Sequence, residues 1–343
     1  MLGIFRYILA LAVTLSHLWT SFAGWSAVAA VFGFYVISGY LMTSILNQSY
    51  GYTRRGIARY ALNRALRIFP TYWFVMLLSI VVVAMIPREA FLTNFKLSMP
   101  SELGDWAANI FILGLLDGPL KVLVPPAWTL DIELVFYIAM GVGLSRSKST
   151  VTIWFAASLA YTLFLLLTGA EFPQRYASYA AASLPFSIGA MTYMYRHEAR
   201  RLLRLPLAVA VVLLLAAAVA SRLEWLAPLG GGFYIMLVCN TLLLIALNNI
   251  DVKKISPRLQ VCDRMLGNIA YPLFLCHWQV AAVVLAVFYA GEKPDGGQLW
   301  LTSFIFIHMV ALLVYYLVDR NVDKARTLVR GKERIDLASL AKS

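Results

Sequence analysis

An arginine and a histidine share the first hydrophobic segment of the chain, which runs from Arg6 to about Phe22. Arg6 and His17 are eleven residues apart, which is close to three turns of about 3.6 residues, so both side chains project from one helix face. Arg6 lies roughly 16 Å from His17 along the helix axis, near the end of the span. Ionisable groups inside a membrane are costly and usually functional. The alternative is an arginine that reaches the headgroups and a histidine that bonds to a neighbouring helix.

Two carboxylates and a second histidine are expected at a similar depth in the membrane. If Pro125 lies at the outer face, Asp131 and Glu133 lie roughly 8–11 Å below it. By the same rise per residue, His277 lies about 12 Å in from the cytoplasm. Each group would cost several kcal/mol if it faced lipid, so we interpret these groups and His17 as one site.

Two kinds of chemistry fit a histidine beside a carboxylate. The histidine can act as a general base that takes a proton from a hydroxyl group. It can also act as a nucleophile that carries an acyl group. The residues alone leave both possibilities open.

A pair of cytoplasmic arginines can bind an anionic substrate. Arg64 and Arg67 are three residues apart on an expected short amphipathic helix, so they share a face. Pro70 is expected in the first turn of the span that follows. Paired guanidinium groups suit phosphate oxygens, although binding to lipid headgroups is an alternative. The sequence contains neither a P-loop nor a glycine-rich dinucleotide motif, which disfavours ATP, NAD or FAD as the donor.

The composition is that of a polytopic membrane protein. Of 343 residues, 61% are hydrophobic and 13% are charged, whereas soluble domains have about 45–50% and about 25%. The three cysteines lack metal-ligand spacing, so we predict neither a disulfide framework nor a metal site. Most of the 29 lysines and arginines fall on the side of the membrane that also holds both termini, which predicts cytoplasmic termini. The net charge of +12 therefore indicates topology and contact with anionic lipids, not nucleic-acid binding.

We therefore expect an all-α protein with about ten transmembrane helices. Residues 1–325 are predicted to form one membrane domain, and residues 326–343 a short charged cytoplasmic tail. The first segment resembles a signal peptide, but its cleavage would remove Arg6 and His17. The expected spans are approximately 4–22, 27–46, 70–86, 128–145, 150–168, 178–195, 206–222, 230–248, 269–290 and 300–319.

Five pieces of the sequence carry a resemblance to a known family. They are R-x10-H from Arg6 to His17, FYVISGY from Phe34 to Tyr40, RALRIFPTY from Arg64 to Tyr72, WTLDIELVFY from Trp128 to Tyr137, and GNIAYPLFLCHW from Gly267 to Trp278. In this order they resemble the signature segments of the membrane-bound acyltransferase-3 family. Three positions depart from the family pattern: Thr129 and Ala270 replace a usual serine, and Phe274 replaces a usual tyrosine.

The resemblance implies a multi-pass enzyme of the inner or plasma membrane that moves an acyl group to a hydroxyl of a surface or exported glycan. The donor implied is an acyl-CoA, most often acetyl-CoA. Some members of the family carry a fused esterase-like domain. We expect none in this chain, so transfer would finish within the membrane domain or with a separate extracytoplasmic protein.

The resemblance also suggests roles for individual residues. His17 is the expected base or acyl carrier, with Glu133, which occupies the motif position, as its orienting partner. His277 is the competing partner, and Asp131 is expected to hydrogen-bond to a neighbouring helix. The donor-binding residues implied are Arg6, Arg64 and Arg67, with Ser38, Tyr72 and Trp128 lining the site or packing behind it.

A transporter or flippase that uses His17 and Glu133 as a proton relay is the alternative function. The spans show neither paired helices broken by glycine and proline nor repeat symmetry, which disfavours it.

Overall fold

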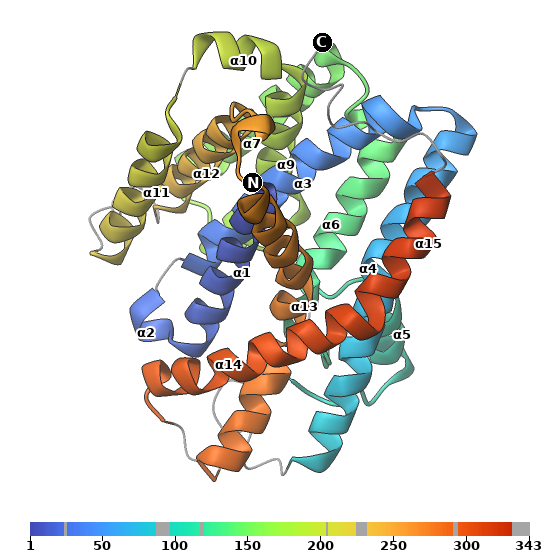
Figure 1. Ribbon diagram of the computed structural model, residues 1–343, viewed down its shortest axis with the longest axis vertical. Helices are drawn as coiled ribbons and strands as arrows, with labels where there is room; N and C mark the ends of the chain where they lie inside the picture. Colours follow the sequence, from blue (N-terminus) through green and yellow to red (C-terminus); the bar gives the residue numbers. More distant parts are fainter. Residues whose placement is uncertain are drawn as a thin grey trace.

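The computed structural model describes residues 1–23, 26–86, 97–116, 120–203, 205–223, 232–290 and 294–330. Within these ranges the regular elements are all helical, as predicted (Figure 1). The α-helices are α1 (Leu2–Leu18), α2 (Thr20–Ala23), α3 (Ser26–Ile45), α4 (Arg54–Met85), α5 (Leu103–Phe111), α6 (Trp128–Ala139), α7 (Lys148–Leu167), α8 (Phe172–Tyr176), α9 (Tyr179–Met194), α10 (Arg196–Leu202), α11 (Leu207–Arg222), α12 (Phe233–Asn248), α13 (Pro257–Phe288), α14 (Gly296–Val314) and α15 (Arg320–Arg330).

Six helices in the described part of the chain are long and apolar enough to cross a membrane. The number rises to seven if α10 and α11, which are bent by 92°, count as one span. Helices α1 and α12 are apolar but shorter, with 17 and 16 residues. The predicted number of ten spans is therefore not confirmed, and the cytoplasmic orientation of the termini stays a prediction. The six candidates are Ser26–Tyr50, Arg54–Met85, Pro125–Leu144, Lys148–Leu167, Pro257–Phe288 and Gly296–Val329.

Helix α4 corrects the expectation of a short amphipathic helix followed by a separate span. It is continuous over 32 residues, and Pro70 lies inside it instead of in a first turn. Proline is tolerated inside membrane helices where neighbouring side chains satisfy the freed backbone groups. Near this proline the Tyr271 hydroxyl donates a hydrogen bond to the Ile68 carbonyl over 3.0 Å. One helix thus carries the arginine pair and the span together.

Helix α14 runs across the front of the molecule and packs against α13, and α15 lies beside α4 (Figure 1). A π-helical turn, Tyr315–Asp319, joins α14 directly to α15. Two hydrogen bonds hold α15 to α4: Asn63 Nδ2 donates to the Arg326 carbonyl over 3.2 Å, and Arg59 Nε donates to the Val329 carbonyl over 2.9 Å. The predicted tail boundary at 326 falls inside α15, and the rest of that tail, 331–343, lies outside the described residues.

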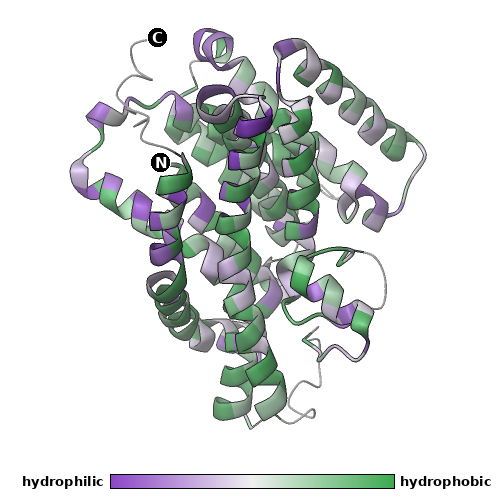
Figure 2. Ribbon diagram, turned by 90° about the vertical axis from the view of Figure 1, so that its right-hand side faces the viewer, coloured by the Kyte–Doolittle hydropathy of each residue, from purple (hydrophilic) through white to green (hydrophobic). Residues whose placement is uncertain are grey.

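Glycines allow the central helices to approach closely. A Cβ atom on Gly3 of α1 would lie 1.9 Å from the Asp263 carbonyl oxygen of α13, and one on Gly39 of α3 would lie 2.1 Å from the Phe186 carbonyl oxygen of α9. Small residues drive helix association in membranes because they let backbones approach. Figure 2 shows hydrophobic residues along most of the helices, with hydrophilic residues concentrated in the upper part of the view, around the N-terminus. The packed core thus places α1 between α3 and α13.

Candidate active site

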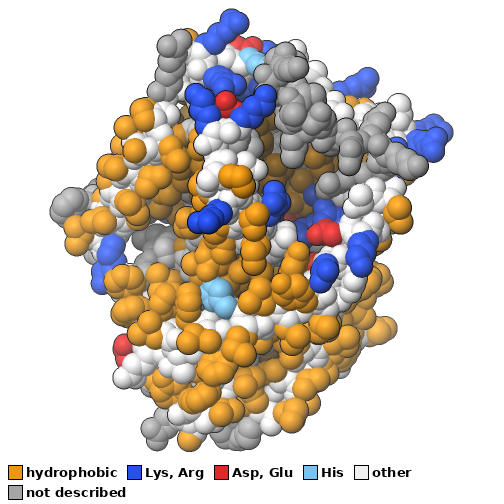
Figure 3. Space-filling view, viewed as in Figure 1, with side chains coloured by type: hydrophobic (Ala, Val, Ile, Leu, Met, Phe, Trp, Pro, Cys, Tyr) orange, Lys and Arg blue, Asp and Glu red, His pale blue; other side chains and the backbone are white. Residues whose placement is uncertain are grey.

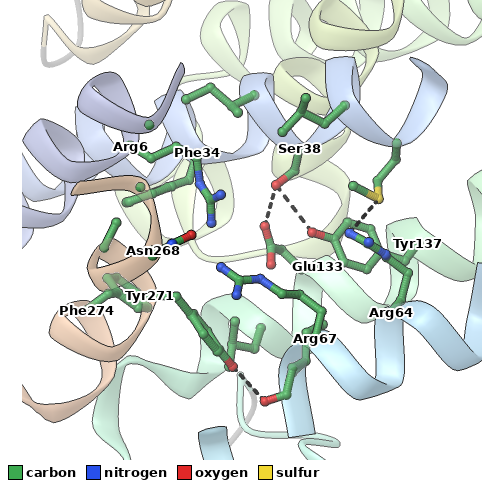
Figure 4. A pocket seen from close by; sticks show the side chains of 18 of the residues that line it. Arg6, Phe34, Ser38, Arg64, Arg67, Glu133, Tyr137, Asn268, Tyr271 and Phe274 are labelled. Carbon is green, nitrogen blue, oxygen red and sulfur yellow. Dashed lines mark hydrogen bonds between the residues drawn. The ribbon is translucent and has the colours of Figure 1, made fainter. Parts of the chain in front are cut away.

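A cavity of about 600 Å³ lies among α1, α3, α4, α6, α13 and α15. All three predicted donor-binding arginines line it, together with Ser38 and Glu133. Figure 4 shows Arg6, Arg67 and Glu133 pointing into the same space. On the face shown in Figure 3, lysine and arginine side chains gather in the upper half, some of them around a hollow beside α15, and hydrophobic side chains cover most of the lower half. The cavity thus joins a basic rim to the interior of the helix bundle.

The cavity carries an excess of positive charge. Arg64 is largely buried, and its Nη2 donates to Asn63 Oδ1 over 2.7 Å. Arg67 lies over the Tyr271 ring, 5.4 Å from its centre. Among the described residues neither Arg6 nor Arg64 forms a salt bridge. Guanidinium groups that lack carboxylate partners suit a ligand that brings its own anionic oxygens.

Glu133 is held on the cavity wall by hydroxyl groups. Ser38 Oγ donates to Glu133 Oε1 over 2.6 Å, and the Tyr137 hydroxyl donates to Ser38 Oγ over 3.4 Å. Ser38 comes from α3, while Glu133 and Tyr137 come from α6. The neighbour of Ser38, Gly39, allows the close contact of α3 with α9. The serine and glycine of this motif therefore have different tasks, one polar and one steric.

The two predicted histidines form a pair. His17 Nδ1 lies 2.9 Å from His277 Nε2, and the two rings are stacked with their centres 5.1 Å apart. His277 Nδ1 lies 2.8 Å from the Phe274 carbonyl oxygen. A carbonyl only accepts, so we assign the proton of neutral His277 to Nδ1, and its Nε2 then accepts from the Nδ1–H of His17. This assignment leaves His17 Nε2 as the nitrogen with a lone pair.

The pairing decides between the two partners considered for His17. The structure pairs His17 with His277, while the hydrogen bond to Glu133 comes from Ser38. In the structure, the hydrogen-bonding partner of His17 is therefore His277, whereas Glu133 was expected from the sequence. Depth estimates placed both candidates near mid-membrane, but α13 packs directly against α1, whereas Glu133 of α6 is hydrogen-bonded to α3.

One aromatic side chain separates the cavity from the histidine pair. On α13 the cavity lining ends at Phe274, three residues before His277, which is a rise of about 4.5 Å. The Phe274 ring centre lies 6.4 Å from that of His277 and 5.7 Å from that of Phe34. Neither histidine is part of the cavity lining in the described chain. The cavity therefore stops about one helical turn short of the histidines.

The second carboxylate of α6, Asp131, joins α6 to the segment around Leu115 and to α9. It is almost completely buried, and its Oδ2 accepts from the Leu115 backbone N–H over 2.9 Å and from the Tyr179 hydroxyl over 3.0 Å. Tyr179 begins α9, so the expected hydrogen bond to a neighbouring helix is formed. Asp131 thus ties three segments together.

Tyr72 and Trp128 lie away from the cavity lining. The Tyr72 hydroxyl donates to the Asn109 carbonyl over 2.6 Å, and the Trp128 ring packs edge-on against Tyr176. The first contact is with α5 and the second with α8. The structure thus gives them packing contacts and not a place on the cavity wall.

Three residues in or beside the cavity wall had no role assigned from the sequence. Tyr137 and Asn268 lie inside the motif segments, so their polarity could have drawn attention to them. Asp319 is a buried carboxylate near the end of an apolar segment, which is a general sign of function in membranes.

Within the described ranges no group of three or more His, Cys, Asp or Glu side chains could hold a metal ion.

Comparison with known proteins adds one finding. Residues 2–320 match the family model Acyl_transf_3, whose description is "Acyltransferase domain". The comparisons found no curated protein and no solved structure that matches the chain. The match spans nearly the whole chain, from α1 into α15. The chain therefore belongs to the acyltransferase-3 family and is a membrane acyltransferase.

Proposed function

We propose that the protein transfers an acyl group, acetyl in the simplest case, from a cytoplasmic acyl-CoA to a hydroxyl of a surface or exported glycan. One observation carries this proposal: an arginine-lined cavity stops one helical turn from a histidine pair. The enzyme would act in the inner or plasma membrane. The cavity would hold the donor, and the histidines would activate the acceptor.

The charge of the cavity suits the donor. Coenzyme A carries three phosphoryl groups at one end and its thioester at the other. Arg6, Arg64 and Arg67 offer guanidinium groups that can each bind phosphate oxygens in a bidentate manner. Bound in this way, the CoA moiety would fill the basic part of the cavity and direct its acyl end toward Phe274.

Glu133 has a second task in this scheme. The pantetheine arm of CoA contains two amide N–H groups, which are hydrogen-bond donors. Glu133, oriented by Ser38, can accept from such a donor on the cavity wall. We therefore assign Glu133 to the placement of the donor arm and not to the orientation of His17.

The histidine pair supports direct transfer. His17 Nε2 takes the proton of the acceptor hydroxyl while the hydroxyl oxygen attacks the thioester carbonyl. The C–S bond then breaks, and the sulfur receives that proton as free CoA thiol leaves. His277 accepts the Nδ1–H of His17 throughout, which fixes the ring and disperses its transient positive charge.

A covalent route uses the same nitrogen. His17 Nε2 can attack the thioester carbonyl itself, so that the C–S bond breaks and CoA leaves as a thiolate that takes a proton from water. The acceptor oxygen then takes the acyl group from Nε2, and the acceptor's proton passes to water through the freed nitrogen. A burst of CoA thiol equal to the amount of enzyme, without any acceptor, would identify this route. Direct transfer gives no such burst.

The proton-relay alternative is disfavoured by the end of the hydrogen-bonded chain. From His17 the chain passes to His277 and then to the Phe274 carbonyl oxygen. A carbonyl accepts a hydrogen bond but has no proton to pass on. Within the described residues, these hydrogen bonds therefore fix the tautomers of the two histidines, and they do not form a path along which protons could pass through the Phe274 carbonyl.

Two measurements test the proposed function. Protein in liposomes with acetyl-CoA inside and a soluble glycan outside should release CoA thiol and label the glycan. Mass spectrometry of the surface glycans of the host, with and without the protein, should show a loss of one acyl group per modified unit. Unchanged glycans, together with thiol release no faster than from protein-free liposomes, would refute the proposal.

A further inference from the structure

Two prolines and one π-helical turn lie close to Arg67. Pro70 lies within α4, Pro272 lies within α13, and the π-helical turn Tyr315–Asp319 joins α14 to α15. Helices α4 and α13 and the π-helical turn contact one another. Single π-helical turns are rare and occur frequently at functional sites. No sequence motif covers the turn, so its contacts need an explanation of their own.

Both ends of the π-helical turn contact residues of the cavity wall. At its start, the Tyr315 hydroxyl accepts a hydrogen bond from Asn268 Nδ2 over 3.0 Å. At its end, Asp319 Oδ1 lies 4.0 Å from Arg67 Nη1. Asn268 and Arg67 both line the cavity, whereas Tyr315 and Asp319 do not. The turn therefore supports the wall from behind.

Asp319 is a buried carboxylate whose main compensation is Arg67. It is 4% exposed, and its Oδ1 accepts a hydrogen bond from Thr71 of α4. Within the described residues its Oδ2 has no hydrogen-bond partner. A buried carboxylate is costly unless an opposite charge lies near it. The guanidinium group of Arg67 supplies that charge.

Arg67 is held from two sides. Its guanidinium group lies over the ring of Tyr271, whose hydroxyl is itself fixed by the Ile68 carbonyl. Asp319 attracts the same guanidinium group through Nη1. A planar group held by an aromatic face and one carboxylate keeps other N–H groups available for a ligand. Figure 4 shows Arg67 reaching into the cavity beside Glu133.

We propose that Asp319 is a positioning residue that holds the Arg67 guanidinium group in the orientation that binds a phosphate of the donor. This inference rests on the proposed function, in which Arg67 contacts CoA. Without the charge of Asp319, Tyr271 alone would hold the guanidinium group of Arg67. That group would then sample a wider range of orientations. Donor affinity would fall although Asp319 touches no donor atom.

The first test is calorimetric titration of CoA into the purified full-length protein. Asp319→Asn keeps the size of the side chain and can still accept from Thr71, so it removes mainly the charge. We expect its Kd for CoA to rise about tenfold. The matched control is Glu198→Gln, which removes an exposed carboxylate paired with Lys148 far from the cavity. The control should bind CoA within about twofold of the unmodified protein.

A double-mutant cycle with Arg67→Ala separates positioning from a general structural role. If Asp319 acts through Arg67, the double mutant should bind CoA as weakly as Arg67→Ala alone. A merely structural role would make the two losses add. Additive losses, or a Kd of Asp319→Asn within about twofold of the unmodified protein, would overturn the inference.

Two further measurements distinguish a failure of this inference from a failure to fold and from a wrong donor site. If Asp319→Asn does not fold, Thr71→Val replaces it, because that variant loses only the hydrogen bond that anchors Asp319. A severalfold weaker affinity for CoA is then expected, and an unchanged affinity would overturn the inference. If Arg67→Ala alone binds CoA like the unmodified protein, the proposed donor site is wrong, whatever Asp319 does.

Discussion

The arginine cavity and the histidine pair are built in opposite ways. The cavity offers about 600 Å³ of space, and two of its arginines form no salt bridge among the described residues. The histidine pair has no such space: His277 is completely buried, and both of its ring nitrogens lie within hydrogen-bond distance of a partner. The first region is open to a ligand and the second is already fixed before a ligand arrives.

This difference suggests a division of work. Binding a large polyanion needs space and uncompensated charge, which the cavity has. Activating a hydroxyl needs one nitrogen in one tautomer, and the proposed function assigns this task to the histidine pair, whose tautomer is set without a carboxylate. Changes in the two regions should therefore affect different kinetic constants.

The largest effect is expected from His17→Ala. Loss of a positioned base should lower kcat about a hundredfold to ten-thousandfold. The Kd for CoA should stay the same, because His17 does not line the cavity. Acyl transfer to the acceptor and calorimetric titration of CoA check both statements. Normal transfer by this variant would show that the two regions are not divided as described.

A smaller effect is expected from His277, and a pair of variants can isolate its cause. His277→Gln keeps an acceptor near the position of Nε2, so it should retain kcat within about tenfold. His277→Leu removes the acceptor and should lower kcat about a hundredfold. Equal activity of the two variants would mean that His277 acts through its bulk and not through the hydrogen bond to His17.

On the cavity side, Arg67→Lys should act on binding. The variant keeps the charge but loses the planar fork, so its Kd for CoA should rise about tenfold, which is ~1.4 kcal/mol. The value of kcat at saturating donor should change little. Parallel titration with CoA that lacks the 3′-phosphate would show which phosphate Arg67 contacts. A loss in kcat without a change in Kd would place Arg67 with the histidines instead.

The smallest effect should come from Asp131→Asn. Its charge-assisted hydrogen bonds to Leu115 and Tyr179 become neutral ones, which should cost about 1 kcal/mol of stability. The unfolding temperature in detergent should fall while CoA binding persists. Glu133→Gln is the matched comparison, two residues along α6, and should lower transfer with little change in that temperature. The reverse result would exchange the roles assigned to the two carboxylates.

Local spacing predicted much of this arrangement. Arg64 and Arg67 were expected on one helix face, and both line the cavity. The eleven-residue interval also placed Arg6 and His17 correctly on one helix. However, only Arg6 lines the cavity, and His17 does not, although both were expected on one face of the same helix. The distance between them along the axis, about 16 Å, takes His17 beyond the end of the cavity.

Contacts between distant segments could not be predicted in the same way. The partner of His17 depends on whether α13 or α6 packs beside α1, and the depths expected from the sequence were too similar to separate the two candidates. Asp319 likewise shows its role only when the turn before α15 is placed behind Arg67. Periodicity describes one helix at a time, whereas these contacts depend on which helices are neighbours.

The contact of α1 with α13 has a consequence for the tolerance of the chain to mutation. A methyl group on Gly3 would meet the Asp263 carbonyl oxygen at 1.9 Å, and one on Gly267 would meet the Gly3 Cα atom at 2.7 Å. Alanine at either position must therefore push the two helices apart. The imidazole hydrogen bond further along these helices tolerates shifts of only a few tenths of an ångström. In a mutational scan these two glycines should be as sensitive as the histidines, although they carry no functional group and lie several helical turns from the histidine pair.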